Sequence, residues 1–135
     1  MLSIFLPFLL ILTSAFAQPV SRVKEAVLNQ EFELKLGQQV LIENERLKIS
    51  FIGVTEDSRC PEGVQCVWAG NGKVVLRLSK VRKRATMMKL NTGVDPKQNA
   101  YQGYDVKLVS LNPYPKKDVK IKIREYVVTL VVSKK

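Results

Sequence analysis

The two cysteines carry the most specific chemistry in this sequence. Cys60 and Cys66 lie six positions apart, and the remainder of the 135 residues contains no further cysteine and no histidine. A structural zinc site needs four ligands, normally Cys or His, and a redox-active pair usually has the spacing Cys-x-x-Cys. An isolated pair in an oxidising compartment instead predicts a disulfide. Closing this short loop is expected to add about 2 kcal/mol to the free energy of unfolding.

Catalytic chemistry finds little support in the sequence. Without histidine, the chain lacks the commonest general base. One Ser-x-x-Lys spacing, Ser21 to Lys24, occurs without the partner motifs that accompany it in β-lactamase-like enzymes. Glu56, Asp57 and Glu62 form an acidic group, but their spacing does not match a calcium-binding loop. We interpret this group as a solvated loop and expect no enzyme, no metal site and no cofactor.

Positive charge is the remaining chemical signal. The chain has 22 Lys and Arg against 12 Asp and Glu, a net charge of +10, which favours anionic partners. The candidate anion-binding residues form two groups: Lys80, Arg82, Lys83 and Arg84, and then Lys116, Lys117, Lys120, Lys122 and Arg124. If both groups share one face, they form a basic stripe for an anionic polymer or envelope component. The alternative is that these residues maintain solubility and protect sheet edges.

The N-terminus predicts export. Residues 1–17 carry no charged side chain, and an apolar stretch over 2–12 precedes the small-x-small pattern of Ala15 and Ala17. This arrangement is typical of a cleavable signal peptide, with cleavage expected after Ala17. The apolar stretch is shorter than the roughly 20 residues of a spanning helix, and no cysteine marks a lipoprotein. We expect a secreted or periplasmic protein with no transmembrane segment in the mature chain, and export argues against a specific nucleic-acid partner.

The elements that must position these residues are expected to be strands. Apolar and polar residues alternate with period two after residue 31, the pattern of strands that bury one face. Gly70-Asn71-Gly72 is predicted to be a hairpin turn. The expected strands are 32–36, 40–42, 47–52, 64–69, 73–81, 86–90, 104–108, and 119–124 continuing through a bulge at 125–126 into a central strand at 126–132.

About seven or eight short strands predict an all-β fold. We expect a single antiparallel β-sandwich, Greek-key or immunoglobulin-like, over residues 31–135, with a small barrel as the alternative. Residues 18–30 are expected to form an N-terminal arm, in which 20–28 forms either a short helix or an extended segment that reaches the first strand.

One motif is distinctive. Residues 57–61 read Asp-Ser-Arg-Cys-Pro, and residues 66–70 read Cys-Val-Trp-Ala-Gly. With Gly37-Gln38 and the Leu-x-Pro-x-Pro segment at 111–115, this frame resembles a family of small, mostly uncharacterised exported bacterial proteins. The resemblance covers roughly residue 32 to the C-terminus and implies an exported all-β domain with a Cys60–Cys66 bridge. It implies no catalytic activity.

The motif has a structural and a functional interpretation. Structurally, the motif would form a corner made by Asp57, Arg59, Pro61, Trp68 and Gly70. Arg59 would make an exposed pair with Asp57 or Glu56, and Val64, Cys66 and Trp68 would lie on one buried face. Functionally, the tip of the loop would be a binding surface. From the positive charge we expect a binding module for an anionic polymer or envelope component. The alternative is a protease inhibitor that presents the Cys60–Cys66 loop.

Overall fold

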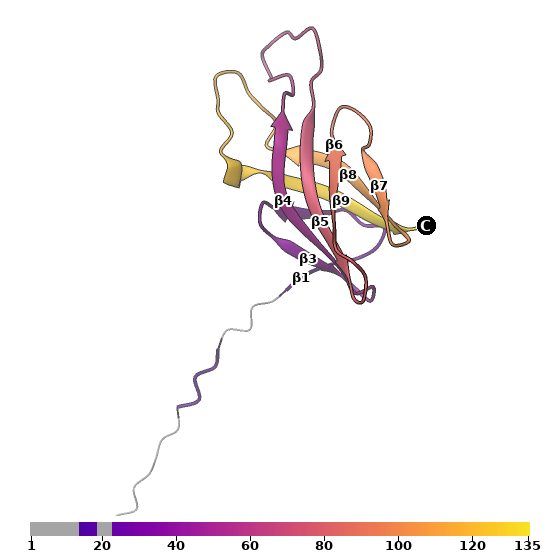
Figure 1. Ribbon diagram of the computed structural model, residues 1–135. Helices are drawn as coiled ribbons and strands as arrows, with labels where there is room; N and C mark the ends of the chain where they lie inside the picture. Colours follow the sequence, from indigo (N-terminus) through magenta and orange to yellow (C-terminus); the bar gives the residue numbers. More distant parts are fainter. Residues whose placement is uncertain (1–13, 19–22) are drawn as a thin grey trace, which may run out of the picture.

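Two stacked β-sheets make up the protein (Figure 1). The computed structural model describes residues 14–18 and 23–135. The first sheet has the order β1 (Lys24–Ala26), β3 (Gln39–Ile42), β4 (Leu47–Asp57), β5 (Gly72–Lys80) and β6 (Thr86–Asn91). The second has the order β2 (Phe32–Lys35), β9 (Val127–Lys134), β8 (Tyr104–Asn112) and β7 (Gln98–Tyr101). All neighbouring strands are antiparallel except β1 and β3.

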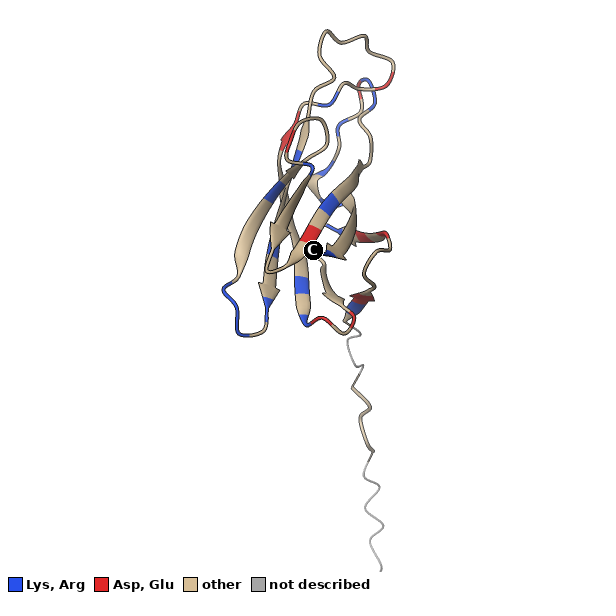
Figure 2. Cartoon of the chain, turned by 90° about the vertical axis from the view of Figure 1, so that its right-hand side faces the viewer, with Lys and Arg blue, Asp and Glu red and all other residues tan. Residues whose placement is uncertain are grey.

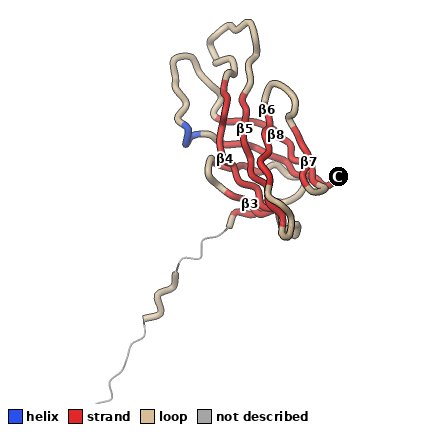
Figure 3. The backbone as a smooth tube through the Cα atoms, viewed as in Figure 1, coloured by secondary structure: helices blue, strands red, loops and turns tan. Residues whose placement is uncertain are grey.

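The sheets do not close into a barrel, so the expected β-sandwich is confirmed and the barrel alternative is wrong. Figure 3 shows how nearly all the regular structure is strand; the only helical element in the described residues is the 3₁₀ turn η1 (Ile123–Glu125). The structure has nine strands in this part of the chain. Strand β7 is one that alternation did not predict, because its residues are exposed up to Tyr101.

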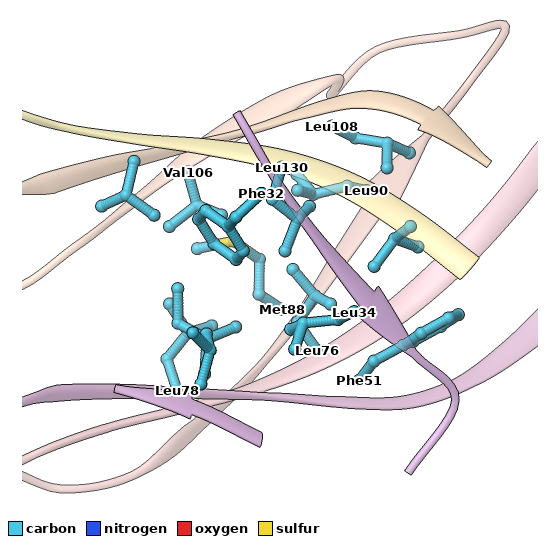
Figure 4. Packing of buried hydrophobic residues seen from close by; sticks show 14 of the residues in the cluster. Phe32, Leu34, Phe51, Leu76, Leu78, Met88, Leu90, Val106, Leu108 and Leu130 are labelled. Atoms are coloured by element: carbon cyan, nitrogen blue, oxygen red, sulfur yellow. The ribbon is translucent and has the colours of Figure 1, made fainter. Parts of the chain in front are cut away.

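The core lies between the sheets, where side chains from both point toward one another (Figure 4). Strand parity explains which residues enter it: Val74, Leu76 and Leu78 of β5 are fully buried, as are Val128, Leu130 and Val132 of β9. Strand β9 lies between β2 and β8, which confirms its expected central place. Thr129 on its other face is also buried.

Strand β4 is longer than alternation predicted. Bulges at Ile52 and Thr55 each insert one residue opposite β5, and pairing then continues to Asp57 opposite Gly72. Ile52 is exposed, and the bulge there shifts the inward face from the odd-numbered residues to Val54, which lies opposite the buried Val74 and packs against the core. Because β4 already pairs with β5 as far as Gly72, the predicted strand at 64–69 has no place in this sheet. That prediction and the hairpin at Gly70-Asn71-Gly72 are wrong, since residues 58–71 form a long loop.

The strand predicted at 119–124 is also wrong. The segment is loop followed by η1. Its alternating sequence suits a strand, but both neighbours of β9 end opposite Val127, β2 at Lys35 and β8 at Asn112, so the residues before Val127 have no strand to pair with. The predicted bulge at 125–126 is absent from the described pairing as well; the second sheet instead has its irregularity in β8, between Leu108 and Ser110.

The N-terminal part is only partly described. Most of the expected signal peptide, and Ser21 of the Ser-x-x-Lys spacing, lie outside the described residues. Within the predicted arm, Lys24–Ala26 form β1 and pair in parallel with β3, so this part is extended and the helical alternative is wrong for it.

Candidate functional site

The loop between β4 and β5 projects beyond one end of the sandwich (Figure 1). We refer to residues 58–71 as the disulfide loop. Cys60 and Cys66 are bonded, with their Cα atoms 6.0 Å apart, which confirms the predicted disulfide. The neck of the loop is closed by backbone hydrogen bonds from Ser58 N to Asn71 O (2.7 Å) and from Cys60 N to Ala69 O (3.0 Å). The loop is therefore held at its base and across its middle.

Arg59 is buried beneath the loop, contrary to the exposed ion pair that we expected. Only 7% of this residue is exposed. Its Nε and Nη2 donate to the two carboxylate oxygens of Asp57 at 2.7 and 2.8 Å. Its Nη1 and Nη2 also donate to the carbonyls of Leu111 (2.6 Å) and Pro113 (3.0 Å). Arg59 thus links the disulfide loop to the end of β8. A guanidinium suits this position because its five N–H donors lie in one plane and can reach several acceptors at once.

Asp57 is an ionised anchor for this arrangement. The Tyr126 hydroxyl donates to its Oδ2 at 2.8 Å. Burial acts to raise the pKa of Asp57, but the hydrogen bonds from Arg59 and Tyr126 outweigh it and hold that pKa below its ordinary value. Burial, together with the nearby Asp57 carboxylate, raises the pKa of Tyr126 to about 12. Asp57 is consequently a structural acceptor at neutral pH.

Gly70 and Asn71 fix the exit of the loop into β5. Gly70 has a φ of +75°, and a Cβ atom there would lie 1.8 Å from the carbonyl oxygen of Ser58. The buried Asn71 donates to Asn91 Oδ1 (2.9 Å) and accepts from the Gly93 amide (2.9 Å). Gly70 and Asn71 are therefore needed because the backbone passes close to Ser58 and Gly93 here, and they do not form the predicted hairpin turn.

A second segment braces the disulfide loop from the side. We refer to residues 113–126, between β8 and β9, as the basic segment. Glu62 N donates to Pro115 O (2.9 Å), and Lys117 N donates to Glu62 O (3.1 Å). The hydroxyl of Tyr114 donates to Cys60 O (2.8 Å). These contacts hold two loops that are about fifty residues apart in sequence in one fixed arrangement.

Trp68 lies on the surface, so the prediction that it is buried beside the disulfide is wrong. Its exposed fraction is 82%, and that of Val67 is 90%. The prediction applied strand parity to residues that form a loop. Trp68 and Val67 belong to an uncharged tract, 63–72, which extends beyond the Lys and Arg positions at this end (Figure 2). Val67 was not among the predicted site residues, although its place in this tract beside Trp68 was a signal for it.

The basic segment presents cations together with further exposed apolar side chains, Val119 and Ile123, which sequence reasoning had assigned to a strand. Its basic residues are all exposed: Lys116, Lys117, Lys120, Lys122 and Arg124. Within the part of the chain that the structure describes, the ion pairs are Asp57–Arg59, Glu56–Lys73 and Glu45–Lys134, so these five cations are unpaired. Against the carboxylates of Glu62, Asp118 and Glu125, they leave a net charge of +2 at this surface.

The other basic group lies at the opposite end of the sandwich. Arg82, Lys83 and Arg84 occupy the turn between β5 and β6, residues 81–85. Lys80 is half-buried at the end of β5 and donates to Glu45 O (2.6 Å) and to the Tyr104 hydroxyl (3.0 Å). The two basic groups therefore do not form the single stripe that we considered (Figure 1).

A hollow of about 330 Å³ lies between the loops, lined by Arg59, Gly70, Gly93, Leu111 and Tyr114 among others. Four of the five N–H groups of Arg59 already donate to protein oxygens. The ring of Tyr114 stacks 5.5 Å from the guanidinium. Arg59 thus has little hydrogen-bonding capacity left for a ligand in this hollow.

The loop-inhibitor alternative remains a prediction, and the geometry does not favour it. A protease that bound the loop as a substrate would use the extended backbone around Glu62. Both the N–H and the C=O of Glu62 are already hydrogen-bonded to the basic segment.

No helix among the described residues is long and apolar enough to cross a membrane. A comparison of the chain with models of protein families, with curated proteins and with solved structures finds no match. The function must therefore be argued from the site itself.

Proposed function

We propose that this protein is an exported binding module that holds an anionic component of the cell envelope or matrix on its disulfide-loop end. The observation that carries the proposal is the basic segment: five exposed cations that form no ion pair within the described residues, on a loop that is hydrogen-bonded to Arg59, Cys60 and Glu62. A braced loop loses little conformational entropy on binding, which favours affinity.

The proposal is for binding without catalysis. The clustered carboxylates are the residues that a hydrolase would use, and two of the three are engaged. Asp57 accepts from Arg59 and Tyr126, and Glu56 pairs with Lys73 at 3.5 Å. The hydrogen bonds from Arg59 and Tyr126 hold the pKa of Asp57 below its ordinary value, which does not suit a general acid near neutral pH.

Export is proposed from two features. The Cys60–Cys66 disulfide suits an oxidising compartment, either the periplasm or the outside of the cell. The uncharged, apolar residues 1–17 supply the expected signal peptide. Together they support a location of the basic segment in a compartment where envelope and matrix polyanions are found.

Binding to a soluble polyanion such as dextran sulfate tests the proposal. A triple variant, Lys117→Ser, Lys120→Ser and Lys122→Ser, should weaken binding about tenfold at 50 mM salt, and binding by the wild-type protein should fall steeply up to 200 mM. The matched control removes the same charge from the other end: Arg82→Ser, Lys83→Ser and Arg84→Ser. Equal weakening by both variants, or salt-independent binding, would contradict the proposal.

A further inference from the structure

We propose that the disulfide-loop end docks onto the surface of an anionic lipid bilayer, with Val67 and Trp68 inserted among the headgroups. This inference rests on the proposed function and names the envelope component as a lipid surface. Its starting point is a contrast within the motif. Asp57, Ser58, Arg59 and Gly70 all make contacts that hold the loop together, whereas Val67 and Trp68 extend into solvent.

The exposure of Trp68 calls for a partner with an apolar surface. An indole has a large apolar body and one N–H donor, and tryptophan concentrates at the interface between water and lipid for that reason. A soluble polyanion requires cations from its binding site, and it makes no use of adjacent exposed Val and Trp side chains. A bilayer surface uses both, because headgroup phosphates attract cations and the region below them accepts apolar groups.

The arrangement of charge matches such a surface. The uncharged tip of the disulfide loop extends furthest, and the cations of the basic segment lie behind it (Figure 2). In the basic segment itself Val119, Ile121 and Ile123 alternate with Lys120, Lys122 and Arg124. Each Lys or Arg close to an anionic membrane raises the partition coefficient about fivefold, and the effect falls off within a Debye length of about 8 Å.

The rigidity of the loop favours insertion. The disulfide, the neck hydrogen bonds and the contacts of Glu62 with the basic segment already order the tip. The apolar tip therefore enters the interface with little further loss of conformational freedom. A flexible loop of the same composition would bind more weakly.

Trp68 is the single tryptophan of the chain, so its fluorescence reports directly on the proposed contact. We expect the emission of the purified protein to shift to shorter wavelength with vesicles of phosphatidylglycerol and phosphatidylcholine. Vesicles of phosphatidylcholine alone should produce no shift at the same lipid concentration. Dextran sulfate should bind without producing the shift, because it offers no apolar interior.

Two variants separate insertion from charge attraction. Trp68→Ser and Val67→Ser should each weaken vesicle binding, measured by co-sedimentation, about tenfold and leave dextran sulfate binding unchanged. Val81→Ser, which replaces an equally apolar exposed residue at the opposite end, is the matched control and should change neither. All variants keep the same N-terminus, so any membrane affinity of residues 1–17 cancels. Unaltered thermal unfolding checks that each variant folds.

The outcomes distinguish the two proposals. Binding to dextran sulfate with no emission shift on anionic vesicles overturns the membrane inference and leaves the proposed function standing. Failure to bind either probe overturns both. An equal shift on phosphatidylcholine vesicles, or vesicle binding that Trp68→Ser does not weaken, overturns the membrane inference.

Discussion

Each end of the sandwich has a cluster of one carboxylate, one tyrosine hydroxyl and one cation that pairs with the carboxylate. At the disulfide-loop end, Asp57 accepts from the Tyr126 hydroxyl and from Arg59. At the opposite end, Glu45 accepts from the Tyr104 hydroxyl (2.5 Å) and pairs with Lys134 (2.8 Å). The antiparallel register places these clusters apart, because β4 and β9 each extend from one end to the other.

The difference lies in the cation. The Arg59 side chain is 6% exposed and also satisfies two backbone carbonyls, whereas the Lys134 side chain is 59% exposed and contacts only the carboxylate end of its partner. A buried pair is costly to break from one side, because the remaining charge stays desolvated. An exposed pair is screened by water and salt. The comparison indicates that the ion pair at the disulfide-loop end is a buried structural contact, whereas the Glu45–Lys134 pair at the other end is open to solvent on its lysine side.

The largest expected effect is at Arg59. Arg59→Ala removes the cation that pairs with Asp57 and the donor to the carbonyls of Leu111 and Pro113, and should lower the free energy of unfolding by about 3–5 kcal/mol in urea titrations. Lys134→Ala is the counterpart at the other end and should have a far smaller effect. Arg59→Lys keeps the positive charge but cannot make all four hydrogen bonds of the guanidinium, so its loss of unfolding free energy should be intermediate. Equal losses at the two ends would refute the comparison.

The next effect compares two glycines with positive φ. Gly70→Ala places a Cβ 1.8 Å from the Ser58 carbonyl oxygen and should cost about 2–4 kcal/mol of unfolding free energy. Gly103, in the turn between β7 and β8, has a φ of +83° with no atom near the position of a Cβ. Gly103→Ala should therefore lower the free energy of unfolding by only about 1–2 kcal/mol, which is the cost of holding alanine in the left-handed conformation. Thermal and urea unfolding of both variants measure the difference, and a smaller loss at Gly70 would argue against the close approach.

The smallest effect concerns acid. The pKa of Asp57 is lowered by folding, so its ionised form stabilises the protein above the unfolded value of about 4, and this contribution is lost as the pH falls through the lower, folded pKa. Asp57→Asn should cost about 2 kcal/mol at pH 7 and flatten the decline in stability below pH 4. The pKa of Glu45 is also lowered, by Lys134 and Tyr104, so Glu45→Gln tests the other end. We expect Glu45→Gln to flatten the acid decline less than Asp57→Asn does.

Alternation predicted the two strands after the disulfide loop well, although it missed β7. Residues 73–81 and 86–90 form β5 and β6 much as expected, and the even-numbered positions of β5 enter the core. The same pattern failed at 64–69 and 119–124. Alternation is a property of one segment, whereas pairing requires a neighbouring strand. Beside 64–69, β5 is already paired with β4, and β2 and β8 end opposite Val127 and do not reach 119–124.

The motif shows the same division. Its cysteines predicted the disulfide, because spacing and compartment determine that chemistry. The burial of Arg59 was missed, since its acceptors at Leu111 and Pro113 lie more than fifty positions away. The exposure of Trp68 was missed because a loop has no strand parity. The basic segment was identified as charged, but its contact with the disulfide loop depends on Glu62, Pro115 and Lys117, which no local pattern connects.

Composition and local pattern were enough to determine that this chain folds as a β-sandwich with one short disulfide. The strands follow from the alternation of apolar and polar residues along each segment, and the disulfide follows from two cysteines six positions apart. Only the tertiary structure decided that Arg59 is an internal clamp, that the two basic groups occupy opposite ends, and that Trp68 extends from a braced loop. These features depend on contacts between segments that are far apart in sequence, and those contacts are set by the free energy of the whole folded molecule.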